Sequence, residues 1–480
     1  MTMSSTKVIV GGTIVTASDM YQADIRIENG IVAAIGSRLD AAGAEIIDAA
    51  GLYVFPGGID PHTHLDMPFG GTVTADDFES GTIAAAFGGT TTVLDFCLTK
   101  RGEPLSEAVR TWHAKAAGKA AVDYGFHLMV ADAGEQALRE LPEIIGREGI
   151  TSLKVFMAYK DVFQVDDGTM FRTLQLAREE GALVMVHAEN GDVIDFLVEQ
   201  ALARGDTDPI HHALTRPPEL EGEATGRAAE LAGLAGAPLY VVHVTCAQAV
   251  QRIGEARARG LAVYGETCPQ YLTLDISSLE KPDFEGAKYV WSPPLREREH
   301  QQVLWDALSS GTLQTVGSDQ CSFHFKGQKE LGRGDFSKIP NGGPTIEDRF
   351  TLLYSEGVEK GRITIHQFVD LVSTASAKLF GLFPRKGTIA VGSDADLVLF
   401  DPSAKRILSA DSHHLKVDYS AFEGMEATGK PVSVLLRGQF VVRDGEFVGQ
   451  AGRGRYVPRA RFGARTPISV PEASAGGRGG

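Results

Sequence analysis

Eight short apolar runs, separated by Ala- and Glu-rich segments, constrain the fold of this 480-residue chain more than any other feature. The runs lie at residues 53–60, 90–96, 124–132, 152–158, 182–188, 239–245, 261–267 and 313–319. Nearly continuous apolar strands that alternate with helices are typical of a parallel sheet covered on both faces. Eight such units predict an α/β fold of the (β/α)8 TIM-barrel type.

The segments on either side of these units have a β character. Asn29-Gly30 separates two apolar stretches, and this dipeptide supplies the positive φ values of a type I′ hairpin turn. We expect residues 1–52 and 385–450 to form one small β-sandwich beside a barrel at residues 53–384. Residues 451–480 are rich in Arg, Pro, Gly and Ser and are expected to be a mobile tail or an arm that reaches a neighbouring subunit.

Composition limits the partners. The chain has 46 Lys+Arg against 62 Asp+Glu, a net charge of −16, which argues against nucleic acid because phosphate binding depends on clustered cations. No apolar run reaches the roughly 18 residues of a membrane span. The 4 cysteines contain no C-x-x-C pair, as expected for free thiols in a reducing cytoplasm. The sequence lacks G-x-S-x-G and G-x-x-x-x-G-K-[ST], which excludes serine hydrolases and P-loop nucleotide hydrolases.

Five candidate metal ligands end predicted barrel strands. His62 and His64 are one residue apart, so in an extended segment both imidazoles point to the same side. His187, His243 and Asp319 end the fifth, sixth and eighth strands. Barrel active sites gather at the carboxyl ends of the strands, so these residues are predicted to meet there and bind metal. The alternative is a pair of surface histidines in a turn, with core histidines elsewhere.

Lys154 lies inside an apolar run, where an unpaired ammonium carries a large desolvation cost. One interpretation is a buried ion pair with an acid such as Asp319. The other is a carbamate, formed from the lysine amine and carbon dioxide, whose two oxygens bridge two cations. Nitrogen and carboxylate ligands favour zinc, with manganese or cobalt as replacements, and two such ions with a shared hydroxide predict hydrolysis. In this interpretation one metal has His62, His64 and Asp319, and the other has His187 and His243.

The local motifs resemble those of the D-hydantoinase/dihydropyrimidinase family of the amidohydrolase superfamily. In chain order they are GGIDPHTHLDMPFGGT, SLKVFMAYK, VMVHAEN, VVHVT, YVWSPPLR, VGSDQCSF and IPNGGP, and GLFPRKGTIAVGSDADLVLFDP resembles the family's return into its sandwich domain. The resemblance covers the chain as far as about Ala451 and implies the same six metal ligands, with no organic or redox cofactor. It also implies a small cyclic substrate and a homo-oligomer, commonly a tetramer.

The activity that the resemblance implies is hydrolytic ring opening. Hydantoins would give N-carbamoyl amino acids, with a D preference, and 5,6-dihydropyrimidines would give N-carbamoyl-β-amino acids. Asp319 would take the proton of the attacking hydroxide and return it to the leaving ring nitrogen. Which of the two ring types is the natural substrate depends on loop shape, which the motifs do not determine.

The same resemblance implies further residues that contact the substrate. Tyr159 would stabilise the oxyanion with its hydroxyl, the alternative being a packing aromatic. Ser292 and Asn341 lie in Pro/Gly-rich loops, where main-chain N–H and C=O groups can pair with a cyclic amide; without the motifs both are turn residues. An apolar pocket for the exocyclic group, or simple barrel packing, is expected from Leu65, Phe69, Phe156 and Phe163.

Other cyclic amidohydrolases and a non-catalytic relative remain as alternatives. Dihydroorotase-like enzymes carry an Arg soon after H-x-H, where this chain has Leu65-Asp66-Met67, and allantoinase-like enzymes stay open. Deaminase-like members generally hold one metal and lack the strand lysine that Lys154 provides here. A dihydropyrimidinase-related scaffold protein loses metal ligands, whereas all six positions are filled in this chain.

Overall fold

Eight parallel strands form the central sheet of the protein, which the computed structural model describes over residues 6–464. Their order is β17-β16-β15-β14-β13-β12-β11-β8. A bridge between Thr63 and Gln320 brings the two edge strands together, so the sheet is nearly closed. The structure confirms the predicted barrel with the strands β8 (Gly58–Thr63), β11 (Thr90–Cys97), β12 (Asp123–Met129), β13 (Ser152–Phe156), β14 (Leu183–His187), β15 (Leu239–Val241), β16 (Val263–Thr267) and β17 (Thr315–Val316).

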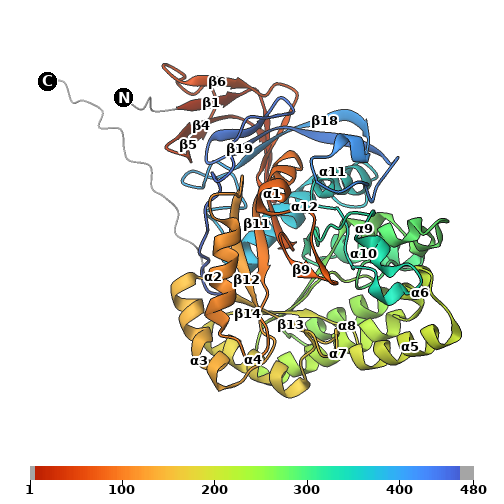
Figure 1. Ribbon diagram of the computed structural model, residues 1–480. Helices are drawn as coiled ribbons and strands as arrows, with labels where there is room; N and C mark the ends of the chain where they lie inside the picture. The colour runs from red at the N-terminus through yellow and green to blue at the C-terminus, as the bar shows by residue number, and fades with distance from the viewer. Residues whose placement is uncertain (1–5, 465–480) are drawn as a thin grey trace.

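Helices connect successive strands and cover the outside of the barrel (Figure 1). Their ends carry ordinary capping residues: Asp166 accepts a hydrogen bond from Thr169 N at the start of α4, and Gly181 ends it with a φ of 64°. In residues 6–464 no helix is both long and apolar enough to cross a membrane. The α-helices are α1 (Phe78–Phe87), α2 (Leu105–Ala116), α3 (Glu135–Glu143), α4 (Asp167–Glu180), α5 (Gly191–Arg204), α6 (Ile210–Leu214), α7 (Pro218–Ala235), α8 (Ala247–Ala258), α9 (Pro269–Thr273), α10 (Glu299–Ser309), α11 (Arg349–Leu352), α12 (Ile365–Val369) and α13 (Ala375–Leu379).

The second body is a β-sandwich built from both ends of the described chain, as predicted (Figure 1). Its sheets have the orders β5-β4-β1-β6 and β21-β20-β19-β18-β7-β2-β3. Aliphatic side chains such as Ile14, Ile25 and Leu397 are buried in its core. The strands are β1 (Lys7–Val10), β2 (Thr13–Val15), β3 (Met20–Gln22), β4 (Asp24–Glu28), β5 (Ile31–Gly36), β6 (Glu45–Asp48), β7 (Tyr53–Pro56), β18 (Leu397–Ile407), β19 (Glu426–Leu436), β20 (Gln439–Arg443) and β21 (Glu446–Phe447), and a separate hairpin has β9 (Pro68–Phe69) and β10 (Thr72–Val73).

Gly57 divides the first apolar run between the two bodies. The sequence places residues 53–60 in one barrel strand, but β7 pairs with β18 of the sandwich and only β8 pairs with β11 of the barrel. A Cβ atom at Gly57 would lie 2.0 Å from Thr91 Oγ1, so the chain passes from one sheet to the other through a gap that has no room for a side chain. The predicted boundary between residues 52 and 53 therefore lies inside the sandwich sheet.

A buried ion cluster joins the barrel to the sandwich. Nζ of Lys386 lies 2.8 Å from Asp123 of β12, 3.2 Å from Asp394 and close to Asp396. These three carboxylates lie close enough together to hold a cation, and the Lys386 ammonium occupies that position. Because charges buried without a partner are costly, the cluster ties the two bodies together.

Residues 451–464 pack against the chain's own barrel. Tyr456 forms a bridge with Tyr124 near the start of β12, and the main-chain N–H groups of Arg459 and Phe462 donate to Gly149 and Gly181. The segment thus crosses the amino ends of β12, β13 and β14. Residues 465–480, which belong to the same predicted tail or arm, lie outside the described residues.

Candidate active site

One pocket at the carboxyl ends of the barrel strands contains all six predicted metal ligands. Two come from β8 and the turn after it, one from β13, one from the end of β14, and two from the segments that follow β15 and β17. Strands that end at the same edge of the barrel bring these distant residues together, as expected from their positions in the sequence. The six are His62, His64, Lys154, His187, His243 and Asp319.

Asp319 and the two histidines of the H-x-H motif form the first group. Nε2 of His62 lies 3.3 Å from Oδ1 of Asp319, and Nε2 of His64 lies 3.4 Å from the same oxygen. Nε2 of His62 is buried and has no hydrogen-bond partner among the described residues. Two nitrogens and one carboxylate oxygen that converge on one point match the donor set of a zinc-like cation.

His187 and His243 form the second group. Nδ1 of His187 lies 2.9 Å from Nε2 of His243, so one ring nitrogen of each residue points into the same space. The stacked rings of His62 and His243 have centroids 5.4 Å apart, which places the second group directly beside the first.

Two buried glutamates orient these histidines, and neither was expected from the sequence. Nδ1 of His62 donates to Glu266 Oε1 over 2.6 Å, and Nε2 of His187 donates to Glu189 Oε2 over 2.8 Å. Each carboxylate pairs with one ring nitrogen of its histidine, so the other ring nitrogen is the one that can face a metal. Glu189 follows His187 by two residues, a proximity that could have identified it, whereas Glu266 is 204 residues away from His62.

Lys154 lines the same pocket as the two groups. It is 1% exposed, and its Nζ forms no hydrogen bond or ion pair with a described residue. The rings of Phe96 and Phe156 each have their centroid 5.0 Å from Nζ. Burial lowers the pKa of Lys154 to about 7, although Asp319 and Glu266 oppose the shift. A neutral amine is the form that can react with carbon dioxide.

Burial also controls the other ionisable groups. It lowers the pKa values of His62 and His243 well below the usual value, which keeps both imidazoles neutral, as metal ligands must be. Burial raises the pKa of Tyr159 to about 12, so its phenol keeps the proton that it can donate. The two groups of donors, with Nε2 of His62 unpartnered among the described residues, therefore fit a pair of divalent cations.

Three residues of the pocket hold the backbone in the left-handed region. The φ angles are 65° at Tyr159, 39° at His243 and 52° at Asp319. Such conformations are uncommon for residues with a side chain and are concentrated at functional sites, because the surrounding structure must hold them. Here they direct the side chains into the pocket immediately after a strand ends.

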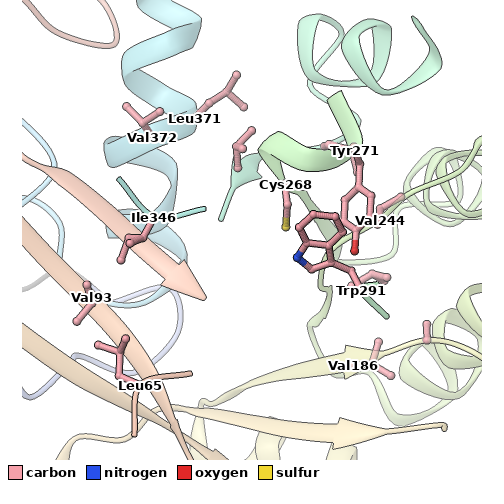
Figure 2. Packing of buried hydrophobic residues seen from close by; sticks show 14 of the residues in the cluster. Leu65, Val93, Val186, Val244, Cys268, Tyr271, Trp291, Ile346, Leu371 and Val372 are labelled. Atoms are coloured by element: carbon pink, nitrogen blue, oxygen red, sulfur yellow. The ribbon is translucent and has the colours of Figure 1, made fainter. Parts of the chain in front are cut away.

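Tyr159, Ser292 and Asn341 are side by side on one wall of the pocket. Nδ2 of Asn341 donates to Ser292 Oγ over 3.0 Å and to Tyr159 Oη over 3.4 Å. Trp291, the residue before Ser292, is buried among Cys268, Tyr271 and Val244 (Figure 2). Within residues 6–464, the main-chain N–H and C=O groups of Ser292 and the N–H of Asn341 make no hydrogen bond to the protein.

The remaining wall is apolar. Phe69, Phe156 and Phe163 of the expected hydrophobic set line the pocket, and the stacked rings of Phe69 and Phe163 have centroids 6.2 Å apart. Leu65 does not line it: its side chain is 0% exposed and packs against Gly81 of α1. Met67 reaches the pocket from the same segment.

A barrel whose mouth holds histidine, carboxylate and lysine donors defines a class of hydrolase that works with bound metal ions. Residues 53–441 match the Amidohydrolase family. A D-hydantoinase of Geobacillus stearothermophilus is 72% identical over 459 residues, which cover 96% of this chain and 98% of that protein. The crystal structure of the dihydropyrimidinase from Brevibacillus agri NCHU1002 has a TM-score of 0.95 and 67% identity, covering 96% of this chain and 100% of that one.

A crystal structure of a D-hydantoinase has the same TM-score of 0.95 and 71% identity, and the match covers 96% of this chain and 100% of that one. The chain therefore belongs to the amidohydrolase family, in its D-hydantoinase/dihydropyrimidinase branch.

Proposed function

We propose that this hydrolase opens hydantoin or 5,6-dihydropyrimidine rings to N-carbamoyl amino acids or N-carbamoyl-β-amino acids. The observation that carries the proposal is the arrangement of one pocket, in which six ligand candidates face the unpaired main-chain groups of Ser292 and Asn341. A cyclic amide presents one C=O and one N–H on the same edge, so a free N–H and a free C=O of the protein complement it. The similar proteins named D-hydantoinase and dihydropyrimidinase support the same ring types.

The cofactor proposed is a pair of divalent cations, zinc or in its place manganese or cobalt. His62, His64 and Asp319 would hold one ion, His187 and His243 the other, and a carbamate on Lys154 would bridge them. When bound, two such ions polarise a carbonyl and supply hydroxide at neutral pH. The lack of thiolate among the donors and the two carboxylate–histidine pairs support zinc.

Asp319 is proposed to move the proton during ring opening. Its carboxylate lies beside both histidines of the H-x-H motif and faces the pocket, where it can accept a proton from the nucleophile and deliver it to the ring nitrogen that leaves. The Tyr159 hydroxyl, which remains protonated, is proposed to donate to the oxygen that gains negative charge as the carbonyl is attacked.

Ser292 and Asn341 are proposed to bind the cyclic amide through main-chain groups. Their side chains already hydrogen-bond to each other, which leaves the backbone to meet the ligand. The three phenylalanines would contact the exocyclic group, with Phe156 next to His187 at a centroid distance of 5.4 Å. An aromatic wall of this kind favours aryl and alkyl hydantoins.

The test is ring opening of dihydrouracil and of 5-phenylhydantoin by purified protein, with metal content measured on the same sample. Opening of either ring with about two metal ions per chain supports the proposal, and the ratio of the two rates identifies the preferred ring. If metal is bound and neither ring opens, the proposal is overturned in favour of another cyclic amide, and an inability to bind metal favours a scaffold.

A homotetramer in the cytoplasm is proposed as the working form. Phe196 on α5 and Leu234 on α7 are 58% and 77% exposed, so each offers an apolar side chain for contact with another copy. The 4 cysteines are free and buried, as suits a reducing compartment. Light scattering after gel filtration measures the oligomeric state, and a monomer at micromolar concentration contradicts the tetramer.

A further inference from the structure

Lys329 is a buried lysine that touches both substrate-binding loops. It begins the short turn Lys329–Gly332, and its side chain is 0% exposed. Its Nζ donates three hydrogen bonds, to the carbonyl oxygens of Val290 at 3.1 Å, Pro340 at 2.7 Å and Gly342 at 2.6 Å. Three acceptors match the three N–H donors of an ammonium group.

The positions of these carbonyls show what the lysine controls. Pro340 and Gly342 are the neighbours of Asn341 on both sides, and Val290 comes two residues before Ser292. We propose that Lys329 is a positioning residue for substrate binding, which holds the Asn341 loop against the Ser292 loop and strengthens the Asn341 N–H as a donor to the cyclic amide. This inference rests on the proposed role of the two loops.

The strengthening follows from the peptide group itself. The carbonyl of Pro340 and the N–H of Asn341 belong to one peptide unit, so a cation at the carbonyl oxygen draws electron density away from the N–H. The other loop has a parallel arrangement, in which Nε2 of His212 donates to the Trp291 carbonyl over 2.7 Å. That carbonyl shares its peptide unit with the N–H of Ser292.

A role in loop stability alone does not explain the choice of lysine. The loops already pair directly, because Gly342 N donates to Val290 O over 2.9 Å. Lys329 makes no ion pair with a described carboxylate, so burial of its ammonium carries a desolvation cost that only three carbonyl oxygens offset. Close packing supplies rigidity without such a cost: a Cβ atom on Gly343 would lie 2.6 Å from the Trp291 ring.

Replacement of Lys329 by methionine tests the proposal, since it keeps the length of the side chain and removes its donors. We expect KM for the preferred ring to rise about tenfold, as for one oriented hydrogen bond, while kcat stays within about threefold. Metal content should equal that of the wild-type enzyme. The matched control is Lys288→Met, which removes a nearby lysine whose Nζ pairs with Glu285 and lies over the Phe325 ring; it should leave KM unchanged.

Two further results decide the outcome. Lys329→Gln keeps two donors and should give a KM between those of the wild type and Lys329→Met; if the methionine variant does not fold, this variant is measured in its place against the wild type. A KM within about twofold of the wild-type value in the folded variant, with metal bound, overturns the proposal. Wild-type enzyme that opens neither ring instead marks failure of the proposed function, which the same assay shows separately.

Discussion

Glu266 accepts a hydrogen bond from Nδ1 of His62 over 2.6 Å, and both side chains are fully buried. Its carboxylate also accepts from the Tyr240 hydroxyl at 2.8 Å and from the main-chain N–H of His243 at 3.1 Å. One carboxylate from β16 thus orients a ligand candidate from each of the two groups. Carboxylates in this position raise the basicity of the histidine and hold its ring in place.

Glu266→Gln should therefore weaken metal binding by about 10–100-fold, because the amide cannot supply the negative charge. The measurement is metal content after dialysis against a series of chelator buffers. Glu347→Gln is the matched control: it alters another glutamate–histidine pair, Glu347 with His414 at 2.8 Å, which lies outside the pocket. Equal metal retention in the two variants contradicts the role given to Glu266.

Lys154→Ala should abolish metal-dependent turnover, since it removes the group proposed to bridge the two ions. Burial lowers the pKa of Lys154 to about 7, so the amine is available to react with carbon dioxide near neutral pH. Wild-type enzyme prepared with carbon-13 bicarbonate should show a labelled carbamate signal in NMR that the variant lacks. Near-normal turnover in Lys154→Ala would remove the binuclear assignment.

Asp319→Asn should retain part of the metal and lose turnover by about 10²–10⁴-fold, the usual contribution of a proton-transferring group. The asparagine oxygen can still face His62 and His64, which lie 3.3 and 3.4 Å from the present carboxylate oxygen. Metal analysis beside initial rates separates the two effects. Retained turnover would exclude Asp319 as the group that moves the proton.

The raised pKa of Asp348, which lies outside the active-site pocket, predicts that the stability of the protein depends on pH. It lies 2.8 Å from Arg406 of β18, and burial raises its pKa to about 6 from the ordinary 3.8. Between these values the folded state binds more protons than the unfolded state, so the contribution of Asp348 to stability falls as pH rises from 4 to 6.

The melting temperature of the wild type minus that of Asp348→Asn should accordingly decrease over that interval and become constant above it. Thermal unfolding at closely spaced pH values, in buffers of equal ionic strength, gives this difference. A difference that rises from pH 4 to 6 would show that the Arg406 pair, and not burial, controls the carboxyl.

The barrel could be predicted from the sequence because most of its strands are buried on both faces. β14, for example, reads Leu-Val-Met-Val-His with every residue buried. The Asn29-Gly30 turn could also be predicted from the sequence, and φ values of 52° and 82° confirm it. The division at Gly57 could not be predicted from the sequence, because one apolar run contributes strands to two sheets. Hydrophobicity does not show which neighbour a strand pairs with.

The residues of the site divide in the same way. The ligand candidates are polar residues at the ends of apolar strands. Because these strand ends share one edge of a barrel, the sequence alone predicts that the candidates lie close together. Glu266 and Lys329 act through contacts with segments far away in the chain or in another loop, and no spacing links them to their partners. Such residues become visible only when hydrogen-bond partners are known.

The amino-terminal end of the barrel is closed by the segment that follows the sandwich. Val457 is 1% exposed and packs with Phe380 and Leu382 beneath the strands, and Arg459 is buried beside them. The pocket is lined only by residues at the opposite end. Substrate and ring-opened product of the proposed reaction are therefore expected to use the same opening, so the product is expected to compete with the substrate for the pocket.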